Sequence, residues 1–379
     1  MKLYEFEGIE LFRRGGILVP DYALAASPEE AKERAQEIGL PVVIKAQVLT
    51  GGRYLARGVQ TAQSLDGVEK IARYILGLSI GGLPVQQVMI AQKVEAIQEL
   101  YLGVTIDEYH GTPVAIISCA GGVSIEGLAK AHPELVVSRN VPAIKGILPD
   151  AQLMAREAGL RGKDLVLVAT ILRNLYAVFR KYDAMVAEIN PLVRTIHGDY
   201  LALDAKVEID DSSLSRHSDL SLNLKDRISN PLELKGREIG VTYVDLDGDI
   251  AVIASGAGLG MASMDIISRK MRPANFLETG GAITADLLYN VMGLVLQKEG
   301  IRALFINVYG GINPIHEGAK GVVRYMQEHR VTIPVVAKAL GNHQEETWKI
   351  FQDHGVHVVT DVSTEKGVEQ LARLLEGGA

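Results

Sequence analysis

Three oxygen-bearing side chains in the middle of the chain, Glu188, Asn190 and Asp204, have the spacing of a polar face on a hairpin. Alternating apolar residues predict strands over 187–193 and 200–206, joined by a short turn. Residues i and i+2 of a strand share a face, so Glu188 and Asn190 project together, and antiparallel pairing can bring Asp204 across to them. Such oxygen ligands suit Mg²⁺, which usually also binds substrate phosphates. The alternative is an ordinary half-exposed hairpin whose polar residues face water.

A lysine in an apolar strand comes directly before a glycine-rich loop with two arginines. The strand is predicted over 41–48 and contains Lys45, and the loop over 49–58 contains Arg53 and Arg57. Backbone N–H groups can approach an anion where glycine leaves room, and the lysine adds a point charge, so these segments are a candidate phosphate-binding site. They lack the Gly-x-x-x-x-Gly-Lys-Ser/Thr spacing of a P-loop. The alternative is a mobile surface hairpin whose arginines are solvated.

The C-terminal part of the chain alternates short apolar strands with helical stretches, which predicts a parallel, doubly wound sheet. The strands are predicted over residues 249–254, 274–277, 303–308, 333–338 and 356–359. Glycine-rich turns at Gly256, Gly280 and Gly310 follow the first three strands, at the edge where such sheets bind ligands. They fit a small-anion site built from helix N-termini, although ordinary strand-to-helix turns would look the same. A dinucleotide site is disfavoured, because the third glycine of the first turn, Gly260, comes one residue early.

With 379 residues the chain is too long for one ordinary core, so two or three domains are expected, with a boundary in the polar stretch 209–236. In the N-terminal part, Ser27 and Glu30 form a capping-box pattern that predicts the start of a helix. The other N-terminal elements are predicted as helices over 4–14, 65–76, 150–159 and 163–181 and extended segments over 19–25, 87–91, 99–106 and 113–118.

Composition excludes several classes of protein. The formal net charge of −7 argues against non-specific binding of nucleic acid. The single cysteine, Cys119, excludes an intrachain disulfide framework and a multi-cysteine metal site. The first residues lack the apolar core of a signal peptide, and no apolar run approaches the length of a membrane span. We therefore expect a cytoplasmic protein without membrane contact.

Taken together in their order, these motifs resemble the β subunit of succinate–CoA ligase (succinyl-CoA synthetase) and its relatives, over essentially the whole chain. Any one motif would be a weak match, and the set is specific at the level of the superfamily. The matching stretches are Val43–Val48, Gly51–Arg53, Glu99–Gly103, Gly121–Val123, Glu188–Leu192, Leu203–Lys206, Gly256–Leu259, Pro273–Leu277 and Asn307–Ile312.

The resemblance implies an α/β protein with an ATP-grasp nucleotide-binding domain over residues 1–235 and a flavodoxin-like CoA-ligase domain, a doubly wound parallel sheet, over 236–379. It implies that the nucleotide is bound by Lys45, by Gly52, Arg53 and Tyr54 of a phosphate-covering loop, and by Glu99. It further implies that Asn190 and Asp204 bind Mg²⁺, with Glu188 as the catalytic residue beside the point of phosphoryl transfer.

In this family a separate α subunit carries CoA and the histidine that is phosphorylated, and the present sequence has no Gly-His-Ala-Gly-type loop. The implied cycle passes a phosphoryl group from the nucleotide to the partner's histidine, then to an acyl phosphate, and ends with acyl-CoA. Metal and cationic groups must offset charge on the moving phosphoryl group. The expected nucleotide is ATP or GTP, with formation of ADP expected over GDP, and the expected assembly is αβ or α2β2.

Departures from the family pattern fall in two places. The family loop reads Gly-Gly-Arg-Gly-Lys-Ala-Gly-Gly, and this chain has Tyr54 in place of its third glycine and Leu55 in place of its lysine. We expect Arg57 to restore part of the charge. A glutamate that places the base in ADP-forming members aligns with Ala91, which leaves the base preference open.

The second group of departures lies where the acid should bind, for which the expected residues are Ser255, Gly311, Ile312 and Asn313. Ser255 replaces a family asparagine, and Pro314 replaces an arginine near the carboxylate site. Asn313 resembles the asparagine of malate–CoA ligases, whose amide could bond a substrate hydroxyl. Succinate, malate, citrate and sulfoacetate are therefore all open as the acid.

Two other classes of function stay open at this stage. One is a non-catalytic relative that binds an α-like partner, and the other is a stand-alone ATP-grasp carboxylate–amine ligase. The lone histidines His217 and His316 are expected to be surface or capping residues more often than participants in chemistry.

Overall fold

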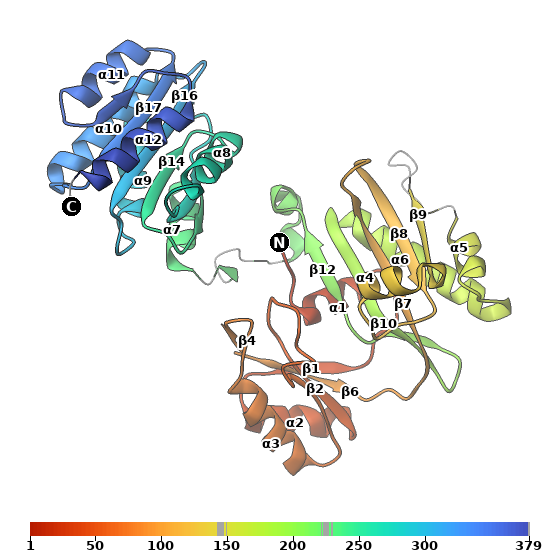
Figure 1. The fold of residues 1–379 in the computed structure, drawn as a ribbon. Coiled ribbons are helices and arrows are strands. Elements are labelled where there is room, and N and C mark those ends of the chain that lie inside the picture. The colour runs from red at the N-terminus through yellow and green to blue at the C-terminus, as the bar shows by residue number, and fades with distance from the viewer. Residues whose placement is uncertain (142–147, 149, 221, 223–226, 229, 378–379) are drawn as a thin grey trace. The chain divides into compact units, whose positions relative to one another are not determined.

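The computed structural model of the chain describes residues 1–141, 148, 150–220, 222, 227–228 and 230–377. It divides into two compact units, Met1–Leu222 and Asn223–Ala379, which are described separately (Figure 1). The division lies earlier than the boundary predicted between residues 235 and 236. The helix α7 (Pro231–Ile239) spans that predicted boundary and packs on elements of the second unit.

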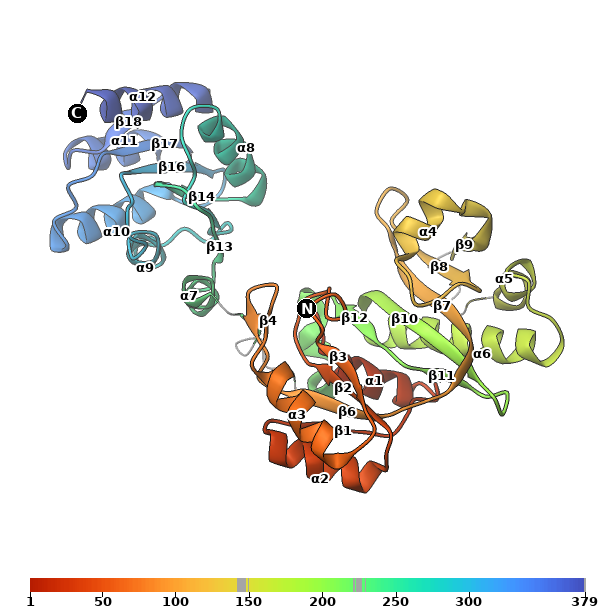
Figure 2. The same ribbon diagram turned by 60° about the horizontal axis from the view of Figure 1, so that its bottom comes forward.

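A four-stranded antiparallel sheet forms the first part of unit 1. Its strands are β1 (Tyr22–Ala25), β2 (Val42–Ala46), β3 (Val59–Ala62) and β6 (Val88–Gln92), in the order β1-β6-β2-β3. Two helices, α2 (Pro28–Ile38) and α3 (Leu65–Leu76), cover one face of this sheet (Figure 2). Burial alternates along β2, so Val42, Ile44 and Ala46 face these helices and Lys45 points to the opposite side.

The two covering helices begin as the sequence predicts. The hydroxyl of Ser27 accepts a hydrogen bond from the backbone N–H of Glu30 at 3.1 Å, and α3 covers the predicted residues 65–76. The Glu30 carboxylate accepts from the backbone of Ala26 instead of Ser27, so the capping box closes one residue early. A short ribbon of β4 (Ser79–Ile80) and β5 (Leu83–Pro84) follows α3.

A larger antiparallel sheet forms the rest of unit 1, in the order β11-β10-β7-β8-β9, with β12 also paired to β10. The strands are β7 (Ala96–Asp107), β8 (Thr112–Ser118), β9 (Val136–Asn140), β10 (Ala184–Thr195), β11 (Tyr200–Ala202) and β12 (Lys206–Ile209). The helices are α1 (Glu5–Arg14), α4 (Ile125–Ala131), α5 (Ala151–Glu157) and α6 (Gly162–Lys181), with 3-10 turns at Pro133–Leu135, Asp211–Arg216 and Ser218–Leu220. The long helix α6 packs on β7 and β10 and fills the main core of the unit.

The predicted hairpin forms, but its second strand is interrupted. Leu192 pairs with Ala202 and Glu188 pairs with Lys206, while β11 ends before Asp204 and β12 begins after it. The prediction of one continuous strand over 200–206 is therefore wrong. Counting inward from both pairs places Asn190 opposite Asp204 inside the break.

The second unit is a doubly wound sheet in the order β13-β15-β14-β16-β17-β18, parallel except for β13 at one edge. Its strands are β13 (Thr242–Asp245), β14 (Ile250–Ala254), β15 (Asn275–Glu278), β16 (Ala303–Gly310), β17 (Val335–Gly341) and β18 (His357–Val359). The helices that follow the five parallel strands are α8 (Ala257–Ser268), α9 (Ala285–Val295), α10 (Ile315–Glu328), α11 (Gln344–Gln352) and α12 (Thr364–Glu376).

Both faces of this sheet are covered, as the continuous apolar strands predict. Val252 of β14 packs with residues of α8 and α12, and its neighbour Ile253 packs with residues of α9, α10 and α11 on the other face. All five predicted strands are present, and β13 is an additional antiparallel edge strand. Among the described residues, no helix is long and apolar enough to cross a lipid bilayer.

Candidate functional site

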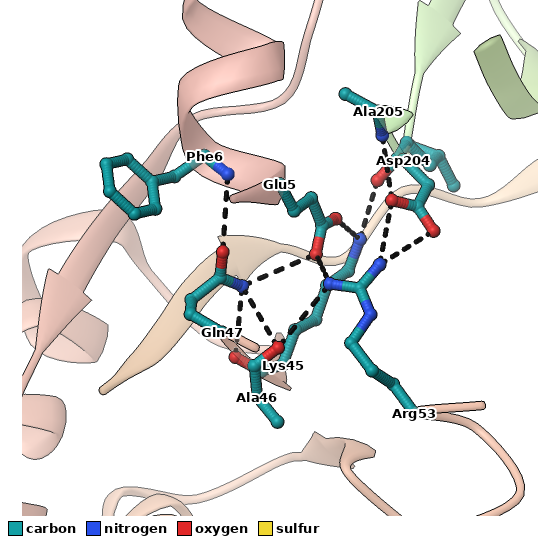
Figure 3. A network of polar contacts seen from close by, with 9 residues as sticks. Glu5, Phe6, Lys45, Ala46, Gln47, Arg53, Asp204 and Ala205 are labelled. Carbon is teal, nitrogen blue, oxygen red and sulfur yellow. Dashed lines mark hydrogen bonds and ion pairs between the residues drawn. The ribbon is translucent and has the colours of Figure 1, made fainter. Parts of the chain in front are cut away.

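A buried glutamate lies at the centre of a polar network in unit 1. Glu5 is in the first turn of α1, and its side chain is only 2% exposed. One carboxylate oxygen accepts from Lys45 Nζ at 2.7 Å, and the other accepts from the guanidinium of Arg53. Figure 3 shows the Glu5 carboxylate pointing between these two cations. Burial opposes ionisation of Glu5, but the charges of Lys45 and Arg53 prevail and lower its pKa.

Backbone contacts fix the start of the chain, and therefore Glu5, against β12. The N–H of Leu3 donates to the carbonyl of Val207 at 2.9 Å. Gly8 of α1 lies so close to the same segment that a Cβ there would approach the Cβ of Ala205 at 3.0 Å. The helix thus packs tightly beside the break that contains Asp204.

Arg53 joins the glycine-rich loop to Asp204. One guanidinium nitrogen donates to both oxygens of the Asp204 carboxylate, at 2.9 and 3.0 Å, and Lys45 Nζ donates to the carbonyl of Leu203 at 2.6 Å. Burial and the nearby Glu5 carboxylate raise the pKa of Asp204, against the opposing effect of Arg53 and Lys45. Two carboxylates share two cations, and Asp204 is the carboxylate whose charged form is less favoured.

Asn190, opposite Asp204 in the break, holds a different loop. Its amide oxygen accepts from the N–H of Gly122 at 2.8 Å, and its amide nitrogen donates to the carbonyl of Val123 at 3.0 Å. Gly122 has a φ of +73°, which favours glycine, and a Cβ there would lie 2.3 Å from the carboxylate end of the Glu99 side chain. The structure therefore places Glu99 beside the loop that Asn190 holds, whereas Arg53 bonds Asp204 and Lys45 bonds the carbonyl of Leu203.

Glu188 is mostly buried on β10, on the same strand face as Asn190. Burial raises the pKa of Glu188, and Lys206, whose Nζ lies 3.6 Å away, partly offsets this. Burial and the Glu188 carboxylate together raise the pKa of the Tyr101 hydroxyl. The nearby Lys206 therefore only partly stabilises the charged form of Glu188. Carboxyl groups with raised pKa values are found more often at catalytic sites than elsewhere.

The donor chemistry of this region fits a hard divalent cation. Asp204 offers carboxylate oxygens, and the amide oxygen of Asn190 has a second lone pair besides the one that Gly122 uses. Both oxygens of Asp204 accept from Arg53, so a cation at Asp204 would either bind through the remaining lone pairs or displace this guanidinium.

The two residues of the glycine-rich loop that differ from the family pattern, Tyr54 and Leu55, point into solvent. Tyr54 is 80% exposed and Leu55 is 89% exposed, and Gly52 adopts a φ of +83° with open space around its Cα. The base of the loop is closed by a hydrogen bond from the N–H of Gly58 to the carbonyl of Arg53 at 2.7 Å. Of the five predicted nucleotide residues, Lys45 and Arg53 are therefore paired with Glu5, whereas Gly52, Tyr54 and Glu99 are exposed.

The predicted acid-binding residues lie in unit 2, at the carboxyl ends of β14 and β16. The hydroxyl of Ser255 accepts from the N–H of Tyr309 at 2.9 Å and ties the two strand ends together. The amide nitrogen of Asn313 lies 3.6 Å from the position of a Cβ on Gly281, so the second and third glycine turns meet. Ile312 is 90% exposed, and Gly311 is exposed beside it.

Sequence reasoning missed Glu5 and Tyr101. A signal for Glu5 was available, because Glu5, Ile9 and Phe12 are spaced i, i+4, i+7 and share the buried face of α1. A charged residue on an apolar stripe needs a buried partner, and the lone lysine of β2 is such a partner. Tyr101 had no comparable signal, because tyrosine is common in ordinary strands.

Comparison with known protein families agrees with the fold of both units. A model of the ATP-grasp domain matches residues 2–194, and a model of the CoA-ligase domain matches residues 253–371. The ATP citrate lyase of Methanothrix soehngenii, solved with citrate and coenzyme A, superposes with a TM-score of 0.78 over 98% of this chain and 99% of that chain. Its sequence identity is 18%, so it supports the fold alone.

Sequence relatives are much closer. The β subunit of GDP-forming succinate–CoA ligase from Thermus thermophilus is 40% identical over 371 residues, which cover 97% of this chain and 98% of the relative. The β subunits of the ADP-forming ligases from Rubrobacter xylanophilus and Desulfurococcus amylolyticus are 37% and 38% identical, over 93% and 100% of this chain and the same shares of the relatives. The chain, with its ATP-grasp and CoA-ligase domains, therefore belongs to the family of succinate–CoA ligase β subunits.

Proposed function

We propose that this chain is the nucleotide-binding β subunit of an acid–CoA ligase that works with a separate α subunit. The reaction converts a small carboxylic acid, CoA and a nucleoside triphosphate to acyl-CoA, nucleoside diphosphate and phosphate. The single observation that carries the proposal is the cluster of Glu5, Lys45, Arg53 and Asp204, which presents two cations and a metal-type carboxylate at one place.

Lys45 and Arg53 bind the nucleotide phosphates in this proposal. Glu5 remains paired with both side chains and fixes their positions, and Arg53 exchanges Asp204 for a phosphate oxygen. Gly52 and Tyr54 lie in the loop that covers the phosphates, and Glu99 lies at the nucleotide pocket. Two cations beside the triphosphate offset charge that builds up during phosphoryl transfer.

Asn190 and Asp204 hold Mg²⁺, which neutralises phosphate charge when the nucleotide is bound. Glu188, on the same strand face, accepts a hydrogen bond from the ring N–H of the partner's histidine and orients that ring toward the nucleotide. Its raised pKa supports this role, because a poorly compensated carboxylate gains most from a new hydrogen-bond donor.

The acid binds at the strand ends of unit 2, at Ser255, Gly311, Ile312 and Asn313. We propose succinate or malate as the acid and ADP as the product nucleotide. Malate is included because the Asn313 amide could bond its hydroxyl, and an unmatched polar group would cost about 1–3 kcal/mol with succinate if buried on binding. The complex with the α subunit is αβ or α2β2.

The decisive experiment follows phosphate from ATP labelled at the γ position in the purified complex with the cognate α subunit. Label on the α chain, discharged by acid plus CoA, is expected. Label on this chain would contradict the proposed partner histidine. An absence of Mg-ATP binding by calorimetry would favour a non-catalytic relative, and activity of this chain alone would favour a stand-alone ligase.

The acid is identified in the same complex with a panel of succinate, malate, citrate and sulfoacetate. Asn313→Val should lower kcat/KM for malate by about 10- to 100-fold, which corresponds to the loss of one buried hydrogen bond, and should keep or raise kcat/KM for succinate, which leaves this amide unmatched. A fast reaction with succinate and none with malate would remove the proposed role of Asn313.

A further inference from the structure

Two histidines and a glutamate form a compact group in unit 2, where α10 and α11 begin. His316 is the second residue of α10, His343 directly precedes α11, and Glu346 is in the first turn of α11. One ligand-type atom of each of the three side chains lies within 4.8 Å of the other two. No other group of three such side chains is found among the described residues.

Parallel strand pairing brings the three residues together from distant parts of the chain. Gly310 at the end of β16 pairs with Gly341 at the end of β17, so the helices that follow begin side by side. The loops are also bonded directly, because Asn342 donates from its backbone to the carbonyl of Gly310 at 2.7 Å and from its amide to the carbonyl of Ile312 at 3.0 Å. The group therefore rests on a rigid strand-end frame.

The contacts within the group are those of potential ligands that lack a central ion. His343 Nδ1 lies 3.3 Å from one oxygen of Glu346, and His316 Nε2 lies 4.0 Å from the other oxygen. The two imidazole rings are 4.6 Å apart between centroids. The side chain of His316 is only 13% exposed, and its Nδ1 is buried without a hydrogen-bond partner.

We propose that His316, His343 and Glu346 form a binding site for a divalent transition-metal ion such as Zn²⁺ or Co²⁺. Two imidazoles and one carboxylate are a common donor set for Zn²⁺ and leave a coordination position for water or a substrate oxygen. Bond lengths near 2.1 Å require ligand atoms roughly 3.4 Å apart, so only small rotations of the half-exposed His343 and Glu346 are needed.

The charges around the group are balanced in favour of a cation by three glutamates. The N-termini of α10 and α11 carry partial positive charge, which by itself would oppose cation binding. Glu317, Glu345 and Glu346 in the first turns offset it, and Glu317 lies 3.0 Å from His316 Nε2, where it can support or join the ligand set. The Glu317 carboxylate also pairs with Lys320, whose Nζ lies 2.6 Å from one of its oxygens.

The site shares its strand-end edge with Ile312 and Asn313. Asn342, next to His343, is bonded to the Ile312 carbonyl, so the metal would lie next to the loop assigned above to the carboxylic acid. The metal site itself rests only on the three side chains and can be tested without enzyme activity.

The test uses the full chain without an affinity tag, stripped with chelator and kept in millimolar Mg²⁺ to saturate sites for hard cations. Co²⁺ is titrated while its visible absorption is followed, and Zn²⁺ binding is measured by competition. We expect one site per chain. His343→Asn should weaken binding at least about 100-fold, because loss of outer-shell partners alone costs 10- to 100-fold. Asparagine tolerates the φ of +59° at this position.

Two further variants complete the design. Glu346→Gln, on the exposed side, should also weaken binding, whereas His354→Asn, near the far end of α11, should bind Co²⁺ as the wild type does. Thermal unfolding should shift upward with Zn²⁺ in the wild type and not in His343→Asn. No saturable Co²⁺ binding, or equal binding by wild type and His343→Asn, would mean a hydrogen-bonded cluster only and would overturn the proposal.

Discussion

Arg53 donates from a single guanidinium nitrogen to both oxygens of Asp204, at 2.9 and 3.0 Å, while another of its nitrogens bonds Glu5. The Arg53 guanidinium thus already occupies a position next to Asp204, where the family resemblance predicts a metal ion. Asp204 is about one-third exposed and its charged form is disfavoured by burial and by Glu5, whereas the Glu5 side chain is almost completely enclosed. On nucleotide binding we expect the Arg53–Asp204 pair to break and the Arg53–Glu5 pair to persist.

Asp204→Ala should reduce nucleotide-dependent phosphorylation of the α partner by about 100-fold or more, because the carboxylate proposed to bind the metal is lost while the fold is kept. Initial rates with labelled ATP measure this. Asp199→Ala is the matched control, since Asp199 is an exposed residue in the turn of the same hairpin. Full activity in Asp204→Ala would exclude the proposed metal role.

Glu5→Gln should destabilise unit 1 by about 3–5 kcal/mol, because it leaves Lys45 and Arg53 facing each other without their buried carboxylate. Urea unfolding at fixed pH gives the free energy. The control is Glu10→Gln on the same helix, where the exposed carboxylate pairs with Arg13 and Arg14 and should contribute less than about 1 kcal/mol. Equal losses in the two variants would argue against the central position of Glu5.

The pH dependence of stability provides an independent test of Glu5. Its pKa is lowered in the folded state, so its contribution is present above the unfolded pKa of about 4.3 and is lost as pH falls through the lower folded value. Wild-type stability should therefore fall more steeply than that of Glu5→Gln below about pH 4.5. Parallel curves would show that Glu5 titrates normally.

Glu188→Gln should separate stability from activity. Burial raises the folded pKa of Glu188, so the folded state binds more protons and stability decreases as pH rises from the unfolded toward the folded pKa. Above both values the ionised group remains a cost, so Glu188→Gln should unfold at the same or a higher temperature than wild type at pH 7.5. Phosphoryl transfer to the α partner should nevertheless fall by about 100-fold or more. A large drop in stability would indicate a structural role instead.

Tyr54 and Leu55 should matter for nucleotide binding and not for folding. Both side chains are exposed and bury little apolar surface. The double variant Tyr54→Gly, Leu55→Lys restores the family pattern and should unfold at nearly the same temperature as wild type. Its Kd for Mg-ATP, measured by calorimetry, should fall, since the added cation faces the phosphates. An unchanged Kd would mean that the loop stays away from the nucleotide.

The sequence predicts the periodic parts of this molecule well. All five parallel strands of unit 2 are predicted because each is a short apolar run between helical stretches, and the face shared by Glu188 and Asn190 follows from strand alternation. The edge strands β3 and β9 carry few apolar residues, which left no pattern to detect.

The candidate site is predicted by residue type but not by geometry. Lys45, Arg53 and Asp204 are named from the sequence, yet Glu5, which bonds both cations, is 40 residues from Lys45 and 48 from Arg53 along the chain. No local pattern shows that α1 packs beside the break at Asp204. The break itself depends on how β10 pairs with β11 and β12, which is a property of the whole sheet.

The bond between Leu3 and Val207 has a consequence for biosynthesis. The first residues of the chain can take their place only after β12 has left the ribosome, roughly 200 residues later and on the order of 10–40 s at ordinary rates of synthesis. Until then Glu5 has no fixed position, and Lys45 and Arg53 lack their shared counter-charge. The proposed phosphate-binding residues are therefore brought together among the last features of unit 1, so truncated or stalled chains of this unit should not bind nucleotide.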